Sequence, residues 1–165
     1  HAKDAHGTNL LDLAAAGGHR EIAELLTEIG VDNQNPFHVA AGLGDLKLVK
    51  RLLKEGYEIN QPDSFGATPL LIAMVAGQEE MVDFLLARNA NPTLTAKDGY
   101  TLMHGAAFSG KKSMVRKALS LGLKVNSRYG EDGITPADVA EDEGDALPYL
   151  RAMGGRTAWE LGPHH

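Results

Sequence analysis

A repeated segment of about 33 residues constrains this chain more than any other feature of its sequence. Asn35, Thr68, Thr101 and Thr135 each open a comparable segment, and the spacings between them are 33, 33 and 34 residues. A further copy opens at Asn9, 26 residues before Asn35. Repeats of this length cannot bury their apolar faces alone, so the copies must stack on one another. The sequence therefore predicts five stacked repeats.

The third repeat shows why each copy should fold as two short helices. Thr68 is a favourable N-cap residue, and Pro69 suits the first helical position, where a missing N–H costs nothing. Gly77 can end this first helix in a left-handed conformation, and residues 78–89 have the broad apolar face of a second helix. A first helix of about eight residues is shorter than the roughly 12–15 needed for marginal stability alone. It must be stabilised by its neighbours.

Four of these segments resemble the ankyrin repeat family, whose signature is Thr-Pro-Leu-His-x-Ala. The matching segments are Asn35-Pro36-Phe37-His38-Val39-Ala40, Thr68-Pro69-Leu70-Leu71-Ile72-Ala73, Thr101-Leu102-Met103-His104-Gly105-Ala106 and Thr135-Pro136-Ala137-Asp138-Val139-Ala140. The resemblance covers about residues 4–154. It implies an all-α fold, a solenoid of stacked helix-turn-helix units with short β-hairpin fingers, which are the loops that join one repeat to the next.

The register places the repeats at about 4–30, 31–60, 61–93, 94–126 and 127–156, all within a single ankyrin-repeat domain over 1–163. We expect the first and last repeats to act as caps. Pro148 should interrupt the second helix of the last repeat. The connection over 31–34 is seven residues shorter than its counterpart in the next repeat, so its finger should be missing. We expect 157–165 to be a tail that ends in a purification-tag remnant.

Two motifs suggest chemistry but favour a structural interpretation. Residues 105–112 carry the glycine and lysine spacing of a phosphate-binding P-loop, yet Lys112 stands where the motif needs Ser or Thr, and the repeat register makes residues 105–109 part of a first helix that Gly110 ends. His38 and His104 occupy the signature position, where the resemblance implies that the ring bonds to the backbone of an adjacent loop. No catalytic constellation can be placed in a deep cleft. We therefore expect no enzyme activity, no cofactor and no metal.

Charge is distributed unevenly along the chain. Seven acidic residues and no Lys or Arg lie between 131 and 145, which leaves +1 for the rest of a chain whose net charge is −6. A solvated cap is one explanation of this segment, and a landing patch for a basic partner is the other. The second helices of the second and fourth repeats should have basic outer faces, formed by Lys47, Lys50, Arg51 and Lys54 and by Lys111, Lys112, Arg116 and Lys117.

We expect a partner-binding surface on the fingers and first helices, because the resemblance implies that partners contact these variable positions. Exposed aromatic residues gathered there have the composition of a protein-binding hot spot, while the alternative is that each ring packs against the next finger. The predicted surface consists of Phe65, Ala67, Val75, Tyr100, Phe108, Tyr129, Glu131, Asp132, Ile134 and Asp142. Its acidic members should meet a basic rim on the partner.

These observations predict a protein–protein interaction module that acts as an inhibitor or adaptor. The alternatives are a regulatory or scaffold part of an enzyme system and a structural spacer without a dedicated partner. The overall negative charge argues against a nucleic-acid partner, and no apolar run approaches the roughly 18 residues of a membrane helix. The absence of cysteine fits a cytoplasmic protein. We expect the isolated chain to be a monomer.

Overall fold

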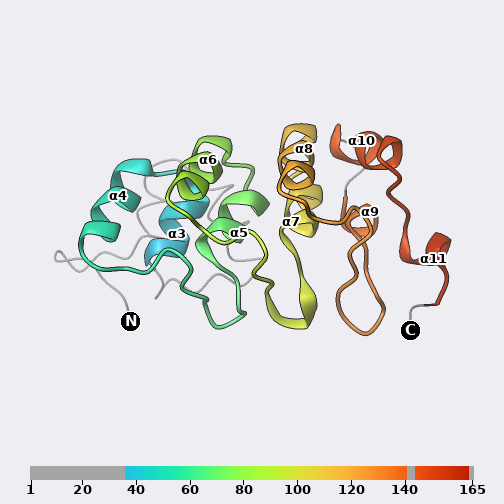
Figure 1. Cartoon of the computed structure of the whole chain (residues 1–165), viewed down its shortest axis with the longest axis horizontal. Coiled ribbons are helices and arrows are strands. Elements are labelled where there is room, and N and C mark those ends of the chain that lie inside the picture. The colour runs from blue at the N-terminus through green and yellow to red at the C-terminus, as the bar shows by residue number, and fades with distance from the viewer. Residues whose placement is uncertain (1–35, 141–143, 164–165) are drawn as a thin grey trace. The chain divides into compact units, whose positions relative to one another are not determined.

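The computed structural model describes residues 36–140 and 144–163. The chain forms two compact units, an N-terminal unit that ends at Asn91 and a C-terminal unit that begins at Pro92. Nine α-helices and one short 3-10 helix lie in the described ranges, with a single isolated β-bridge there (Figure 1). This architecture confirms the all-α prediction. The repeat predicted at 4–30 and the short connection at 31–34 lie outside the described residues.

Two helix pairs build the described part of the N-terminal unit: α3 (Pro36–Leu43) with α4 (Leu46–Lys54), and α5 (Pro69–Val75) with α6 (Glu79–Ala87). Within this unit, α3 packs against α4 and α5, and α5 packs against α6. Every residue of α5 is buried, which explains how a seven-residue helix persists. The predicted ends are confirmed, since the Thr68 side chain accepts a hydrogen bond from the Leu71 N–H and Gly77 has a φ of +72°.

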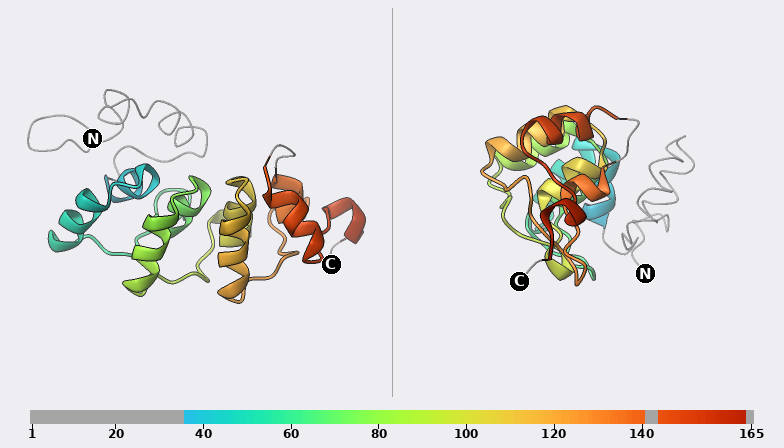
Figure 2. Two further views of the ribbon diagram at one scale, coloured as in Figure 1. Left: turned by 90° about the horizontal axis from the view of Figure 1, so that it is seen from above. Right: turned by 90° about the vertical axis from the view of Figure 1, so that its right-hand side faces the viewer.

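The C-terminal unit contains the 3-10 helix η1 (Lys97–Gly99), α7 (Leu102–Phe108), α8 (Lys112–Ser120), α9 (Pro136–Val139), α10 (Ala146–Ala152) and α11 (Ala158–Leu161). Here α7 packs against α8, α9 and α10, and α10 also packs against α8 and α9 (Figure 2). Met103, Met114 and Leu150 are fully buried among these helices. In the segment that resembles a P-loop, residues 105–108 belong to α7, and Gly110 lies with a φ of +73° in the turn before α8.

Two predictions about the last repeat need correction. Pro148 does not interrupt the second helix, because it is the third residue of α10, in the first turn, where backbone N–H groups lack helical partners. Residues 158–161 of the expected tail form α11, whose Thr157 and Glu160 make a reciprocal capping box. The Asn126 side chain also accepts a hydrogen bond from the Arg156 N–H at 2.8 Å, which joins this segment to the preceding loop.

The fingers are small hydrogen-bonded turns. In the N-terminal unit, the Asp63 N–H donates to the Ala67 carbonyl at 2.9 Å, and the Asp63 carboxylate accepts from the Phe65 and Ala67 N–H groups. In the C-terminal unit, the Ala96 N–H donates to the Tyr100 carbonyl at 2.9 Å. The next finger is closed by the antiparallel bridge between Tyr129 and Ile134, whose N–H groups donate to each other's carbonyl oxygens at 3.0 and 2.9 Å.

The signature histidines bind the finger that follows them, as predicted. His38 Nε2 lies 3.0 Å from the Ala67 carbonyl oxygen, and His104 Nε2 lies 2.8 Å from that of Ile134. Burial lowers the pKa of both imidazoles, which favours the neutral form. In the last repeat Asp138 takes this place, and its Oδ2 accepts a hydrogen bond from the Ala158 N–H at 2.8 Å. The two histidine contacts each fix a finger to the first helix before it, and the Asp138 contact fixes the start of α11 to α9.

Candidate partner-binding surface

An aromatic cluster of Tyr100, His104 and Tyr129 lies at the base of the fingers in the C-terminal unit. The Tyr100 and Tyr129 ring centroids are 4.9 Å apart in an edge-on arrangement. The His104 centroid lies 5.2 Å from that of Tyr100 and 4.8 Å from that of Tyr129. These separations fall in the range of favourable aromatic pairs. Burial, with a smaller contribution from Tyr129, raises the pKa of the Tyr100 hydroxyl, so this group stays neutral.

The two fingers of this unit are also joined through their backbones. The Gly130 N–H donates to the Asp98 carbonyl at 2.8 Å. Asp98 and Gly99 both have positive φ, at +64° and +88°, and glycine adopts this conformation without the steric cost that other residues meet. Both loops project from the same side of the helices (Figure 1). The Tyr129–Ile134 hairpin is therefore held on one side by rings and by a backbone hydrogen bond.

The Tyr129–Ile134 hairpin and the end of α7 carry acidic, aromatic and apolar side chains. Glu131 and Asp132 are exposed at the tip of the hairpin, while Tyr129 and Ile134 at its base are half-buried. Phe108 is half-buried at the last position of α7. Tyr100 and Tyr129 thus pack against each other across neighbouring fingers, as the alternative interpretation expected, and each keeps part of its surface accessible.

The remaining predicted residues are placed differently. Ala67 and Val75 are only 7% and 4% exposed, so the fold of the N-terminal unit buries both side chains. Phe65 is 48% exposed on the finger of the same unit. Asp142 lies outside the described residues. The structure thus brings Tyr100, Tyr129, Ile134, Glu131 and Asp132 together on two adjoining fingers of the C-terminal unit.

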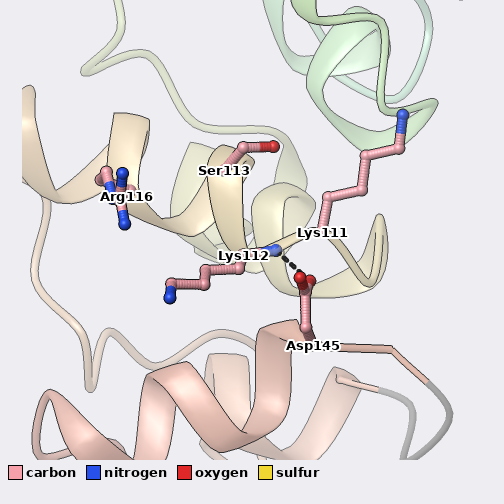
Figure 3. A pocket seen from close by; sticks show the side chains of 5 residues that line it. All are labelled: Lys111, Lys112, Ser113, Arg116 and Asp145. Carbon is pink, nitrogen blue, oxygen red and sulfur yellow. Dashed lines mark hydrogen bonds between the residues drawn. The ribbon is translucent and has the colours of Figure 1, made fainter.

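Two exposed features were not predicted as sites from the sequence. Lys112 and Arg116, with Lys111, Ser113 and Asp145, line a pocket of about 300 Å³ at the start of α8 (Figure 3). The four-residue spacing of Lys112 and Arg116 on a helix with a basic face could have indicated this pocket from the sequence. Trp159, on α11, is 93% exposed. The Thr157-to-Glu160 capping pattern could have located its helix, but Thr157 follows Thr135 by 22 residues and falls outside the 33-residue register.

Searches for other kinds of site were limited to the described parts of the chain. No group of three or more His, Cys, Asp or Glu residues within 36–140 and 144–163 could hold a metal ion. In the same ranges, no helix has the length and apolar composition that crossing a membrane requires.

Comparison with known proteins identifies the family of the repeats. The family model for ankyrin repeats matches residues 37–129 with three copies. A putative ankyrin repeat protein of fowlpox virus is 31% identical over 80% of this chain and 43% of its own length. An inactive serine/threonine-protein kinase of Bos taurus is 36% identical over 61% of this chain and 7% of its own length. Phosphocholine transferase AnkX of Legionella pneumophila is 35% identical over 53% and 9%. The chain spans less than half the length of each of these relatives.

Proposed function

The chain belongs to the ankyrin repeat family, whose repeats are generally protein–protein interaction modules, and we propose that it binds a partner protein through the fingers of its C-terminal unit. The contact surface consists of the Tyr129–Ile134 hairpin, Tyr100 on the preceding finger and Phe108 at the end of α7. The partner presents basic groups to Glu131 and Asp132 and an apolar group to the aromatic side chains.

The observation that supports this proposal is an exposed acidic hairpin tip on a rigid aromatic base. Tyrosine is enriched in binding hot spots, where a large ring contributes apolar area at a small cost in conformational entropy. The Tyr100 and Tyr129 rings are already fixed by their mutual contact and by His104. A partner would therefore order few side chains on binding, which favours affinity. The exposed carboxylates would mainly raise the association rate for a basic partner.

A binding role without catalysis suits these residues best. The proposed contact residues are aromatic, apolar or acidic, and His38 and His104 are engaged with backbone carbonyls. We propose that the chain acts as a monomeric inhibitor or adaptor in the cytoplasm. The relatives include an inactive kinase and a transferase, but the matched region is less than a tenth of each of those two proteins, so their names do not assign an activity here.

Selection from a displayed peptide library would test the proposal without a known partner. Binders of the hairpin surface should be rich in Lys and Arg beside an apolar anchor. Their affinity should fall by about tenfold or more for the double variant Glu131→Lys, Asp132→Lys, because each exposed contact becomes repulsive. Phe108→Ala should weaken binding by about tenfold or more if the ring is a hot spot. Circular dichroism of each variant would show that the fold is retained.

Two further variants separate this surface from other parts of the chain. Phe65→Ser removes the exposed ring of the N-terminal unit, and Lys47→Glu changes an exposed charge on α4 by the same amount as each hairpin substitution. Neither should alter the affinity of the selected binders. If binders lose affinity for Phe65→Ser and keep it for the hairpin double variant, the binding surface belongs to the N-terminal unit and the proposal is wrong.

A further inference from the structure

A second surface of the C-terminal unit has the opposite charge. Lys112 and Arg116 lie one turn apart on α8 and extend to the same side of the pocket, whereas Lys111 points away from them (Figure 3). Among the described residues, three cations and one carboxylate, that of Asp145, line the pocket. This local excess of positive charge contrasts with the net charge of −6 for the whole chain.

An aromatic ring holds the two cations in place. Lys112 Nζ lies 5.2 Å and Arg116 Cζ lies 5.9 Å from the centroid of the Tyr149 ring, which comes from α10. Both distances are within the range of cation–π contacts. In the parts of the chain that the structure describes, neither cation is paired with a carboxylate. No carboxylate of the described residues therefore neutralises these two charges, which an external anion could bind.

The Asp145 carboxylate binds the backbone of α8 and not the side chains of Lys112 and Arg116. Its Oδ1 accepts a hydrogen bond from the Lys112 backbone N–H at the start of α8, shown by the dashed line in Figure 3. This carboxylate therefore caps the helix and occupies a backbone donor that a bound phosphate group would otherwise use. The side chains of Lys112 and Arg116 are left as the main groups for recognition, which favours separate carboxylates over one compact phosphate.

We propose that Lys112, Arg116 and Tyr149 form a docking site for an acidic peptide segment of a partner protein. Four residues of α-helix span about 6 Å, which is close to the separation of residues i and i+2 in an extended chain. A Glu-x-Glu segment in extended conformation can therefore place one carboxylate at each cation. The Tyr149 ring offers apolar surface to the side chain or backbone between them. This site is separate from the hairpin surface and recognises the opposite charge.

Fluorescence anisotropy with a labelled peptide containing Glu-Ala-Glu would test the site, with a Gln-Ala-Gln peptide of otherwise identical sequence as the control. The chain should bind the first peptide and not the second. Lys112→Gln and Arg116→Gln should each weaken binding by about tenfold, as expected for loss of a charged hydrogen bond. Both substitutions leave the Lys112 backbone N–H bonded to Asp145, so α8 should remain capped.

Asp145→Asn gives the most specific readout. The amide oxygen can still accept the Lys112 N–H hydrogen bond, but the negative charge beside the pocket is gone. This variant should bind the Glu-Ala-Glu peptide about threefold or more tightly, since a like charge near the ligand is removed. The double variant Lys47→Glu, Lys54→Glu changes exposed charges on α4 by −4 in total and should leave the affinity within about twofold at 0.15 M salt, where distant charges are screened.

Several results would overturn the proposal. One is equal loss of affinity in the α4 double variant and in the pocket variants, which would mean unspecific charge attraction. Displacement of the peptide by inorganic phosphate at constant ionic strength would identify a phosphate site instead. Tighter binding of an oligothymidylate, lost in the same pocket variants, would identify a nucleic-acid surface. Self-association in sedimentation experiments that Arg116→Gln abolishes would assign the pocket to a second copy of the chain.

Discussion

Replacing His104 by leucine should reveal how strongly the signature histidine fixes the hairpin of the candidate surface. The substitution has a counterpart within the chain, because Leu71 stands at the equivalent position of the preceding repeat. The hydrogen bonds of both ring nitrogens are lost: Nε2 donates to the Ile134 carbonyl, and Nδ1 bonds to Thr101, whose N–H and Oγ1 lie 3.2 and 2.8 Å away. At about 0.5–1.5 kcal/mol each, the free energy of unfolding should fall by about 1–3 kcal/mol.

The same variant should change how stability depends on pH. Because burial lowers the pKa of His104 in the folded state, folding favours neutral imidazole. Its contribution is complete above the unfolded pKa of about 6.5 and is lost as the pH falls from there towards the folded pKa. Each histidine can remove up to about 1.4 kcal/mol per pH unit in this window. His38 should behave alike, since burial also lowers its pKa.

Urea denaturation followed by circular dichroism at pH 7.5 and pH 5.5 would measure both effects. The wild-type chain should lose stability between these values, His104→Leu should lose less, and the double variant His38→Leu, His104→Leu should lose least. The reasoning is refuted if His104→Leu is as stable as the wild type at pH 7.5, or if its loss on acidification equals that of the wild type.

Three other predictions concern the C-terminal unit. Gly144→Ala should cost about 2–4 kcal/mol in urea denaturation, because a Cβ would collide with the Gly110 carbonyl that accepts hydrogen bonds from Asp145 and Ala146. Gly122→Ala, which has a φ of +85° but open space around it, should cost only about 1–2 kcal/mol, and equal losses would argue against a tight crossing. Leu150→Ala should cost about 2–5 kcal/mol, since Leu150 is fully buried, and a loss below 1 kcal/mol in the same assay would contradict its place in the core. Hydrogen bonds from Thr157 and Arg151 lower the pKa of Glu160 to about 2, so the cap of α11 should persist above pH 4.5 and weaken as the pH falls towards 2. Trp159 anisotropy should report this change, and Glu160→Gln should abolish it.

The helix pairs were predictable because the residues that start and end helices recur at the positions that the 33-residue repeat predicts. A residue such as Thr68 followed by Pro69 specifies a helix start whatever surrounds it, and Gly77 specifies an end. The histidine contacts followed from the family resemblance. Pro148 was misjudged because the same residue breaks a helix interior and is tolerated in a first turn, and only the position of the helix start distinguishes the two cases.

The candidate surface was less predictable because burial depends on which way a finger turns. Ala67 and Tyr100 close equivalent loops one repeat apart, yet Ala67 is in the core and Tyr100 is half-buried. Tyr100 contacts Tyr129, 29 positions further along the chain. The repeat register indicates that their fingers are neighbours, but not that the two rings touch. The pocket beside α8 needed Tyr149 from another helix, and no local pattern in the sequence links that ring to Lys112 and Arg116.

Histidine at position 104 and aspartate at position 138, the signature positions of the last two repeats, should make their two contacts differ in sensitivity to acid. His104 donates to a carbonyl, whereas Asp138 accepts from an amide. Desolvation acts to raise the pKa of Asp138, but hydrogen bonds from Thr135 and Ala158 outweigh it and lower the pKa from its ordinary value. As the pH falls, the His104 contact that holds the Tyr129–Ile134 hairpin should therefore weaken before the contact of Asp138 with α11. Acidic surroundings would therefore loosen the acidic finger first and leave the C-terminal helix in place for longer.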